Sequence, residues 1–101
     1  MASRLNLHEE FCTILASRNA YFQPPASVQM QYPAIVYSLD NIDKLHANDD
    51  MYKAHMAYTV TLIDKNPDTK YLMPIMAFPY CRFNRFYTAD KLNHWVFTLY
   101  Y

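Results

Sequence analysis

The sequence predicts an α+β domain, in which a mostly antiparallel sheet packs against an N-terminal helix and a second short helix, in the order α-β-β-α-β-β. Two observations carry this prediction: apolar residues near the N-terminus recur at helical spacing, and three later segments alternate with a period of two. The 101 residues suffice for a single domain over residues 1–101, and 52% hydrophobic with 18% charged residues are typical of a folded chain.

The first helix is predicted over residues 3–18. Leu7, Phe11 and Leu15 lie one helical turn apart and form an apolar stripe suited to pack on a sheet. Ser3 is a suitable N-cap residue, because its hydroxyl can accept a hydrogen bond from a free backbone N–H of the first turn.

Residues 19–31 are predicted to be a connection with short extended pieces at Ala20–Gln23 and Val28–Gln31. Pro24 and Pro25 separate these pieces, because proline has no N–H to donate to a strand ladder.

The first strand is predicted at Ala34–Leu39, where β-branched and aromatic residues follow a proline. Residues 40–51 are mostly polar, and their apolar residues recur at neither helical nor strand spacing, so we expect a long loop there. Residues 52–64 then alternate, with Met56, Tyr58, Val60 and Leu62 on one face, so they predict a long strand.

A second helix is predicted at residues 70–78, capped by Asp68 or Thr69, and Pro74 is compatible with it only in a first turn. It follows a turn at residues 66–68.

The C-terminal part predicts a hairpin of two strands, residues 80–88 and 93–101, joined at residues 89–92. The alternation places one set of side chains of the first strand on a common face: Cys81, Phe83, Arg85 and Tyr87. The second strand shows the same pattern at Trp95, Phe97, Leu99 and Tyr101.

The absence of glycine excludes the glycine-containing phosphate loops and nucleophile elbow. Turns that require positive φ are therefore assigned to Asn or Asp, at Asn41, Asn48, Asp49 or Asn66. The formal net charge of zero argues against nucleic-acid binding as a class. The chain shows no signal peptide and no apolar stretch of membrane-spanning length, so we expect folding in a reducing cytoplasm with two free thiols.

Four groups of residues could carry chemistry, and each also has a structural interpretation. His8 and Cys12 lie one helical turn apart, as metal ligands can, but are also a core cysteine and its polar neighbour. Cys81 and His94 are a candidate nucleophile pair or an inert thiol and a surface histidine.

The third group is an acidic cluster, which could bind a cation or could form a solvated loop. The fourth is a strand of basic and aromatic residues, which could stack on nucleic-acid bases or could form a protein interface. Their members are Asp40, Asp43, Asp49 and Asp50 in the third group, and Arg82, Phe83, Arg85 and Phe86 in the fourth. The structural interpretation is preferred throughout, so no catalytic residue, cofactor or metal is expected.

Four blocks of the sequence resemble a family of small proteins encoded among the head–tail joining genes of long-tailed bacteriophages. The blocks are Tyr21–Pro25, Val28–Tyr37, Tyr58–Asp68 and Leu92–Tyr101. Members are described as tail-completion, tail-terminator or tail-to-head joining proteins. The resemblance runs from about residue 10 to the C-terminus and fits least well at residues 70–78.

The resemblance implies a structural virion protein and not an enzyme. Tail terminators are α+β proteins that assemble into a hexameric ring. The ring caps the tail tube protein and presents a surface to the head connector, or stopper, protein. The implied place is the tail or neck of the virion, after synthesis in the host cytoplasm. The genome passes through the ring without sequence-specific binding, and no membrane is involved.

Ring formation requires two different surfaces on each copy. We expect the contacts at the proline-rich connection, the polar loop and the basic strand. The candidate interface residues are Pro24, Pro25, Tyr32, Asp43, Lys44, His46, Asp49, Asp50, Arg82 and Arg85. Three alternatives stay open: a head-completion protein on the portal side, a small nucleic-acid-binding domain, and a cysteine-dependent enzyme.

Overall fold

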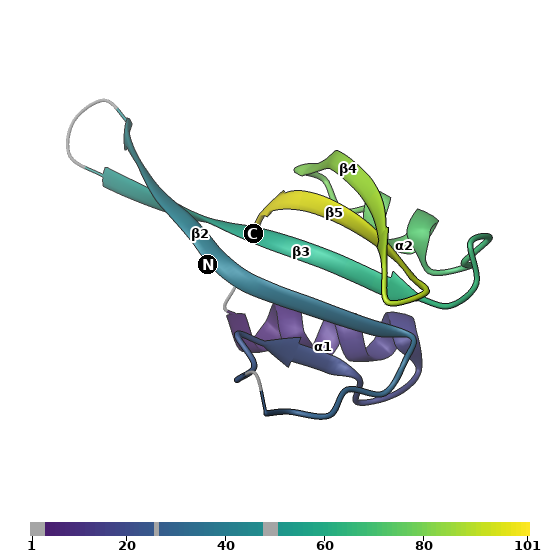
Figure 1. The fold of residues 1–101 in the computed structure, drawn as a ribbon. Coiled ribbons are helices and arrows are strands. Elements are labelled where there is room, and N and C mark those ends of the chain that lie inside the picture. The colour runs from purple at the N-terminus through teal and green to yellow at the C-terminus, as the bar shows by residue number, and fades with distance from the viewer. Residues whose placement is uncertain (1–3, 26, 48–50) are drawn as a thin grey trace.

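The computed structural model describes residues 4–25, 27–47 and 51–101 (Figure 1). Within residues 41–55 the description concerns the backbone alone. The elements in chain order are α1 (Arg4–Leu15), β1 (Ala20–Phe22), β2 (Ala34–Ala47), β3 (Met51–Asp64), α2 (Leu72–Met76), β4 (Cys81–Ala89) and β5 (Leu92–Tyr100).

The strands form a five-stranded sheet in the order β1-β2-β3-β5-β4. Every pair is antiparallel except β1–β2, which is parallel with Ala20 beside Ile35. The prediction of an α+β fold with a mostly antiparallel sheet is confirmed. The predicted order of elements is wrong, because β1 adds a strand between α1 and β2. This strand lies at the extended piece predicted at Ala20–Gln23 within the connection.

Both helices contribute to one hydrophobic core on one face of the sheet. Phe11 of α1 is fully buried and meets the Tyr37 ring edge-on at 5.1 Å between centroids. It also meets Phe78, the residue that follows α2, at 5.9 Å. The predicted face of β3 is confirmed for Tyr58, Val60 and Leu62, which all lie in this core.

Helix α1 ends earlier than predicted because Ala16 leaves the helical region with φ of 54°. The Ser17 N–H donates to the Cys12 carbonyl, and the Ala16 N–H donates to the Thr13 carbonyl. This pair of bonds is a Schellman motif, which usually has glycine at the position of Ala16. The proposed cap residue Ser3 lies outside the described residues.

The assignment of positive φ to Asn and Asp is largely wrong. Positive φ occurs at Ala16, Gln23, Asp90 and Lys91 within the described ranges, and not at Asn41 or Asn66. Asn48 and Asp49 lie outside those ranges. Asp90 and Lys91 form a two-residue connection with both φ values positive, as a type I′ hairpin turn requires.

The predicted long loop at residues 40–51 is also wrong over most of its length. Strands β2 and β3 each run for 14 residues and pair from Ala34–Ile63 to Ala47–Met51, with one register shift between Leu39 and Asn41. Only residues 48–50 lie outside the described ladder. Strand β5 pairs with β3 no further than Ala57, so the distal part of the β2–β3 hairpin projects beyond the sheet as a two-stranded ribbon (Figure 1).

The second helix is shorter than predicted. Helix α2 spans Leu72–Met76, and Pro74 lies in its first turn, where a missing N–H breaks no helical bond. The predicted side-chain cap is wrong, because the N-cap residue is Tyr71 without a side-chain bond. The Thr69 hydroxyl instead accepts from the Tyr71 N–H at 3.3 Å.

The last residue is held by two contacts. The Tyr101 N–H donates to the Met56 carbonyl at 3.0 Å, and the Tyr101 hydroxyl donates to Glu10 of α1. Partial burial and this hydrogen bond raise the pKa of Tyr101 to about 12. No helix in the described part of the chain is long and apolar enough to cross a membrane.

Candidate interaction surface

The two edges of the sheet differ in how they are protected. Strand β1 has three residues and is followed by Pro24 and Pro25, which cannot extend a ladder. Strand β4 has nine residues and, within the described part of the chain, pairs only with β5. It contains no proline, and its protection is limited to Arg82, Arg85 and the irregular pairing between Phe83 and Arg85. Its first residue is half-buried and the other eight are exposed. Long exposed edges of this kind pair readily with another strand.

A β-bulge at Asn84 decides which side chains of β4 share a face. Phe83 lies opposite Phe97, but Arg85 lies opposite Val96, so the register shifts by one residue between them. Opposite residues of an antiparallel pair point to the same face of a sheet. The prediction that Cys81, Phe83, Arg85 and Tyr87 share a face is therefore wrong.

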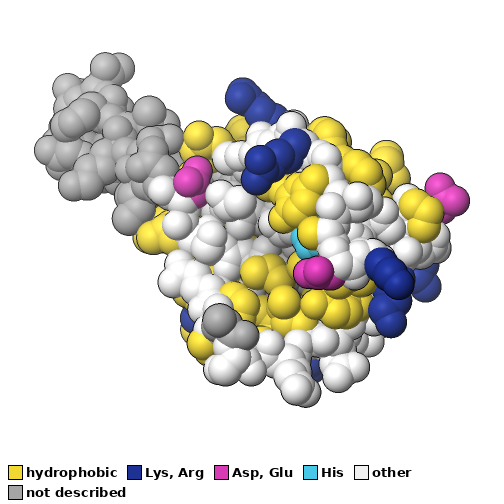
Figure 2. All heavy atoms as spheres, in the orientation of Figure 1, with side chains coloured by type: hydrophobic (Ala, Val, Ile, Leu, Met, Phe, Trp, Pro, Cys, Tyr) yellow, Lys and Arg dark blue, Asp and Glu magenta, His cyan; other side chains and the backbone are white. Residues whose placement is uncertain are grey.

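The face of β4 toward the helices is aromatic. Phe83 meets the core residue Phe97 edge-on at 5.6 Å, and Phe86 meets Trp95 at 5.4 Å. Phe83 and Phe86 nevertheless remain 42% and 48% exposed, because each is covered on one side only. Hydrophobic side chains therefore lie at the surface along β4, next to Lys and Arg side chains (Figure 2).

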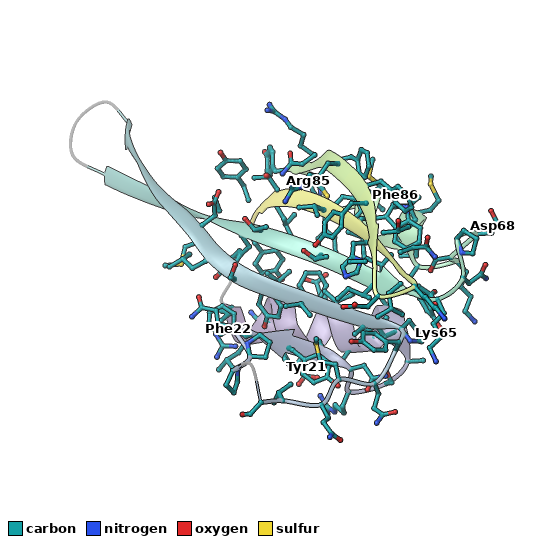
Figure 3. The ribbon with its side chains drawn as sticks, viewed as in Figure 1. Tyr21, Phe22, Lys65, Asp68, Arg85 and Phe86 are labelled. Atoms are coloured by element: carbon teal, nitrogen blue, oxygen red, sulfur yellow. The ribbon has the colours of Figure 1, made fainter. Side chains whose placement is uncertain are left out.

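The opposite face of β4 is basic. Arg82 lies opposite Thr98 and Arg85 opposite Val96, and the bulge thus brings both arginines to the same face. The Arg85 guanidinium lies 5.3 Å from the centre of the Tyr87 ring, which stacks on His94 at 4.6 Å. Figure 3 labels Arg85 and Phe86, neighbours in sequence that belong to these two different faces.

This arrangement bears on nucleic-acid recognition. Base stacking by a basic-aromatic strand requires the aromatic rings and the cations on one surface. Phe83 and Phe86 instead lie on the face opposite to Arg82 and Arg85. The structure does not bring this predicted combination together.

The β2–β3 ribbon contains several of the predicted interface residues. Asp43, Lys44 and His46 belong to β2, and their side chains lie outside the description. Asp49 and Asp50 lie outside the described residues. Asp40, where the pairing of β2 with β3 shifts register, is exposed.

The segment between β1 and β2 carries the remaining predicted residues. Pro25 is exposed, whereas Pro24 and Tyr32 are half-buried. The Tyr32–Pro33 peptide bond is cis, and the Gln31 N–H donates to the Tyr21 hydroxyl at 3.1 Å. This segment borders β1, where Figure 3 labels Tyr21 and Phe22. It is distant in the strand order from β4, which lies at the opposite edge.

The candidate nucleophile pair is not assembled. Cys81 lies opposite Leu99 and His94 lies opposite Tyr87, so the two are at opposite ends of the β4–β5 hairpin. Burial raises the pKa of the Cys81 thiol, which disfavours the nucleophilic thiolate. Cys12 is also a free thiol, and it is buried in the core.

His8 has a structural partner. Its Nδ1 lies 2.6 Å from the hydroxyl of buried Tyr37, to which the Arg4 guanidinium also donates. Burial, followed by the positive charge of Arg4, lowers the pKa of His8. No group of three or more potential metal ligands occurs among the described residues.

The sequence did not single out a shallow groove between the two helices. Its volume is about 370 Å³, and Ile14, Pro74 and Phe78 are among its lining residues. Near it, Met73 and Tyr80 are 72% and 68% exposed. The only sequence signal was the high methionine and aromatic content of residues 70–80, which equally fits a core.

No protein-family model matches this chain, and no curated protein is similar to it in sequence.

Proposed function

We propose that this chain is a structural virion protein, a tail terminator or tail-completion protein. In this proposal, copies associate into a hexameric ring that caps the tail tube and joins it to the head connector. Its place is the tail or neck of the particle. The mechanism is surface complementarity, and the chain has no catalytic role.

The observation that carries the proposal is the presence of two different incomplete β-structures on one small domain. One is the exposed edge of β4, and the other is the β2–β3 ribbon beyond the sheet. Two-stranded ribbons are marginally stable in water on their own, and exposed edges are pairing sites. Both features are typical of a subunit completed by neighbours.

The two features also differ from each other, which favours a ring. A ring arises when one surface of each copy binds a different surface of the next copy and the rotation closes. The ribbon makes the molecule elongated, with extents of 51 × 25 × 22 Å. An elongated subunit can reach past its immediate contact toward the next copy.

The resemblance of the four sequence blocks to the joining proteins supports the assignment to the tail. Helix content supports the terminator over the portal-side alternative. The helices described here have 12 and five residues, whereas head-completion proteins are expected to be more helical.

The test is an assembly assay. Purified protein is measured by native mass spectrometry and negative-stain microscopy, and is then added to polymerising tail tube protein from the same phage. We expect rings of six copies and tubes whose growth stops when the protein is added. Protein that stays monomeric and leaves tube growth unchanged would refute the proposal.

A further inference from the structure

We infer that the ring joint is a β-sheet continued between copies, in which β4 of one copy pairs with the free edge of β2 in the ribbon of the next copy. This inference rests on the proposed function and specifies the partner of its candidate surface. It concerns the described part of β2 from Asp40 to Ala47 and makes no use of residues 48–50.

The first argument is that both edges are open. Strand β4 has a ladder partner on one side only. Strand β2 pairs with β1 only from Ile35 to Tyr37, and beyond Tyr37 its described residues have β3 as their one strand neighbour. The Leu39 N–H donates to the Gln23 side chain, which closes the β1 side of this edge. The free edge of β2 therefore begins after Leu39.

The second argument is length. The free part of β2 and the whole of β4 are both long strands, since β2 continues to Ala47 and β4 has nine residues. Strands of this length span roughly 25–30 Å at about 3.3 Å per residue. The two edges are therefore similar in length, and the regular part of β4 after its bulge at Asn84 can pair with the regular part of β2 after Asp40.

The third argument is charge. Strand β4 carries Arg82 and Arg85 and no acidic residue. Pairing of β4 with β4 of another copy would bring four arginines together on one face, which like-charge repulsion disfavours. The distal part of β2 carries Asp40 and Asp43 against the single base Lys44.

The edge of β3 in the same ribbon is a poorer partner for β4. Beyond its pairing with β5, its described residues Met51–Met56 carry the base Lys53 and no acid. The charges thus select β2 over both β3 and a second β4.

The fourth argument is the pattern of exposed apolar side chains. Leu39 on β2 is 42% exposed, similar to Phe83 and Phe86 on β4. Pairing the two strands would place these side chains on a continuous surface and remove part of each from water. No such gain is available to the isolated copy.

The experiment uses charge reversal in the full chain, with association measured at low ionic strength by native mass spectrometry and light scattering. Variant A carries Arg82→Glu and Arg85→Glu. Variant B carries Asp40→Lys and Asp43→Lys. We expect each alone to raise the concentration at which rings form by about tenfold or more, because like charges then face each other at the joint.

Mixing the two variants provides the decisive observation. The acidic β4 of variant A matches the basic β2 of variant B, and the basic β4 of variant B matches the acidic β2 of variant A. We expect the equimolar mixture to form rings of alternating copies, within about threefold of the wild-type concentration. Hydrogen exchange of residues 81–89 should slow on ring formation in the wild type and in the mixture.

The control variant carries Lys65→Glu and Lys70→Glu in the connection between β3 and α2. It changes the net charge by the same amount as variant A and should assemble as the wild type does. Rings that form unchanged in variant A, or a mixture that does not assemble when both variants are folded, would overturn the joint and leave the proposed function standing. A wild-type protein that blocks tube growth as a monomer would overturn the joint and the ring, and would leave only the capping of the tube. A monomer without effect on tubes would overturn both.

Discussion

Replacing Phe11 with alanine tests how α1 is attached to the sheet. Phe11 is fully buried, contacts Tyr37 of β2 and Phe78 after α2, and thereby joins three elements. Removing a buried phenylalanine side chain costs about 3–5 kcal/mol, since the apolar contacts are lost and a cavity remains. A domain of this size has a free energy of unfolding of about 5–15 kcal/mol, so a large fraction of the stability is at stake.

The assay is urea unfolding followed by the fluorescence of Trp95, the only tryptophan and a buried core residue. With a denaturant slope of about 2 kcal/mol/M, a loss of 4 kcal/mol, the midpoint of that range, lowers the urea midpoint by about 2 M. Phe11→Leu keeps most of the volume but loses the edge-to-face contacts, so we expect a loss of about 1–2 kcal/mol.

The matched control is Leu5→Ala on the same helix. Leu5 is 66% exposed, so its truncation is expected to change stability by less than about 0.5 kcal/mol. A loss below about 1 kcal/mol in Phe11→Ala, or a loss equal to that of Leu5→Ala, would refute the described packing of α1 on the sheet.

Three further predictions concern pH, thiol reactivity and a helix end. The fold lowers the pKa of His8 below 6.5, so its contribution to stability is present above about pH 6.5 and is lost on acidification. In wild type the urea midpoint should therefore fall between about pH 7.5 and 5.5, and His8→Gln should make this fall smaller. An equal fall in both proteins would contradict the prediction. Burial raises the pKa of the Cys81 thiol, and Cys12 is buried in the core. An aromatic disulfide reagent at about pH 8 should therefore label both thiols more slowly in the native protein than in the urea-unfolded chain. Equal labelling rates would count against the described burial. Ala16→Gly should raise the free energy of unfolding by about 1 kcal/mol, because glycine adopts the observed φ of 54° without steric cost. The control Ala20→Gly in β1 should lower the free energy of unfolding. Destabilisation by Ala16→Gly would argue against the Schellman motif.

The class of fold and most of its elements were predictable from the sequence alone. The apolar stripe of α1 and the alternation of β3 and β5 report on which side chains are buried, and burial of that pattern is what stabilises a helix or strand in a domain. The place of the β4–β5 turn was predictable for the same reason, although the residues with positive φ were not. Arg82 and Arg85 were predictable as interface candidates from their residue type alone, because arginine and aromatic residues are enriched at protein interfaces.

Only the tertiary structure decided which strands pair and which faces the side chains occupy. The polar residues 41–47 form a strand because β3 supplies their ladder partners, and their own alternation gives no such signal. The extended piece at Ala20–Gln23 was predictable, but its parallel pairing with Ile35–Tyr37 as strand β1 depends on residues distant in sequence. The bulge at Asn84 exchanges the faces of every later residue of β4, because the side-chain period of a strand is two. The basic and aromatic faces of β4 are therefore a property of the pairing with β5.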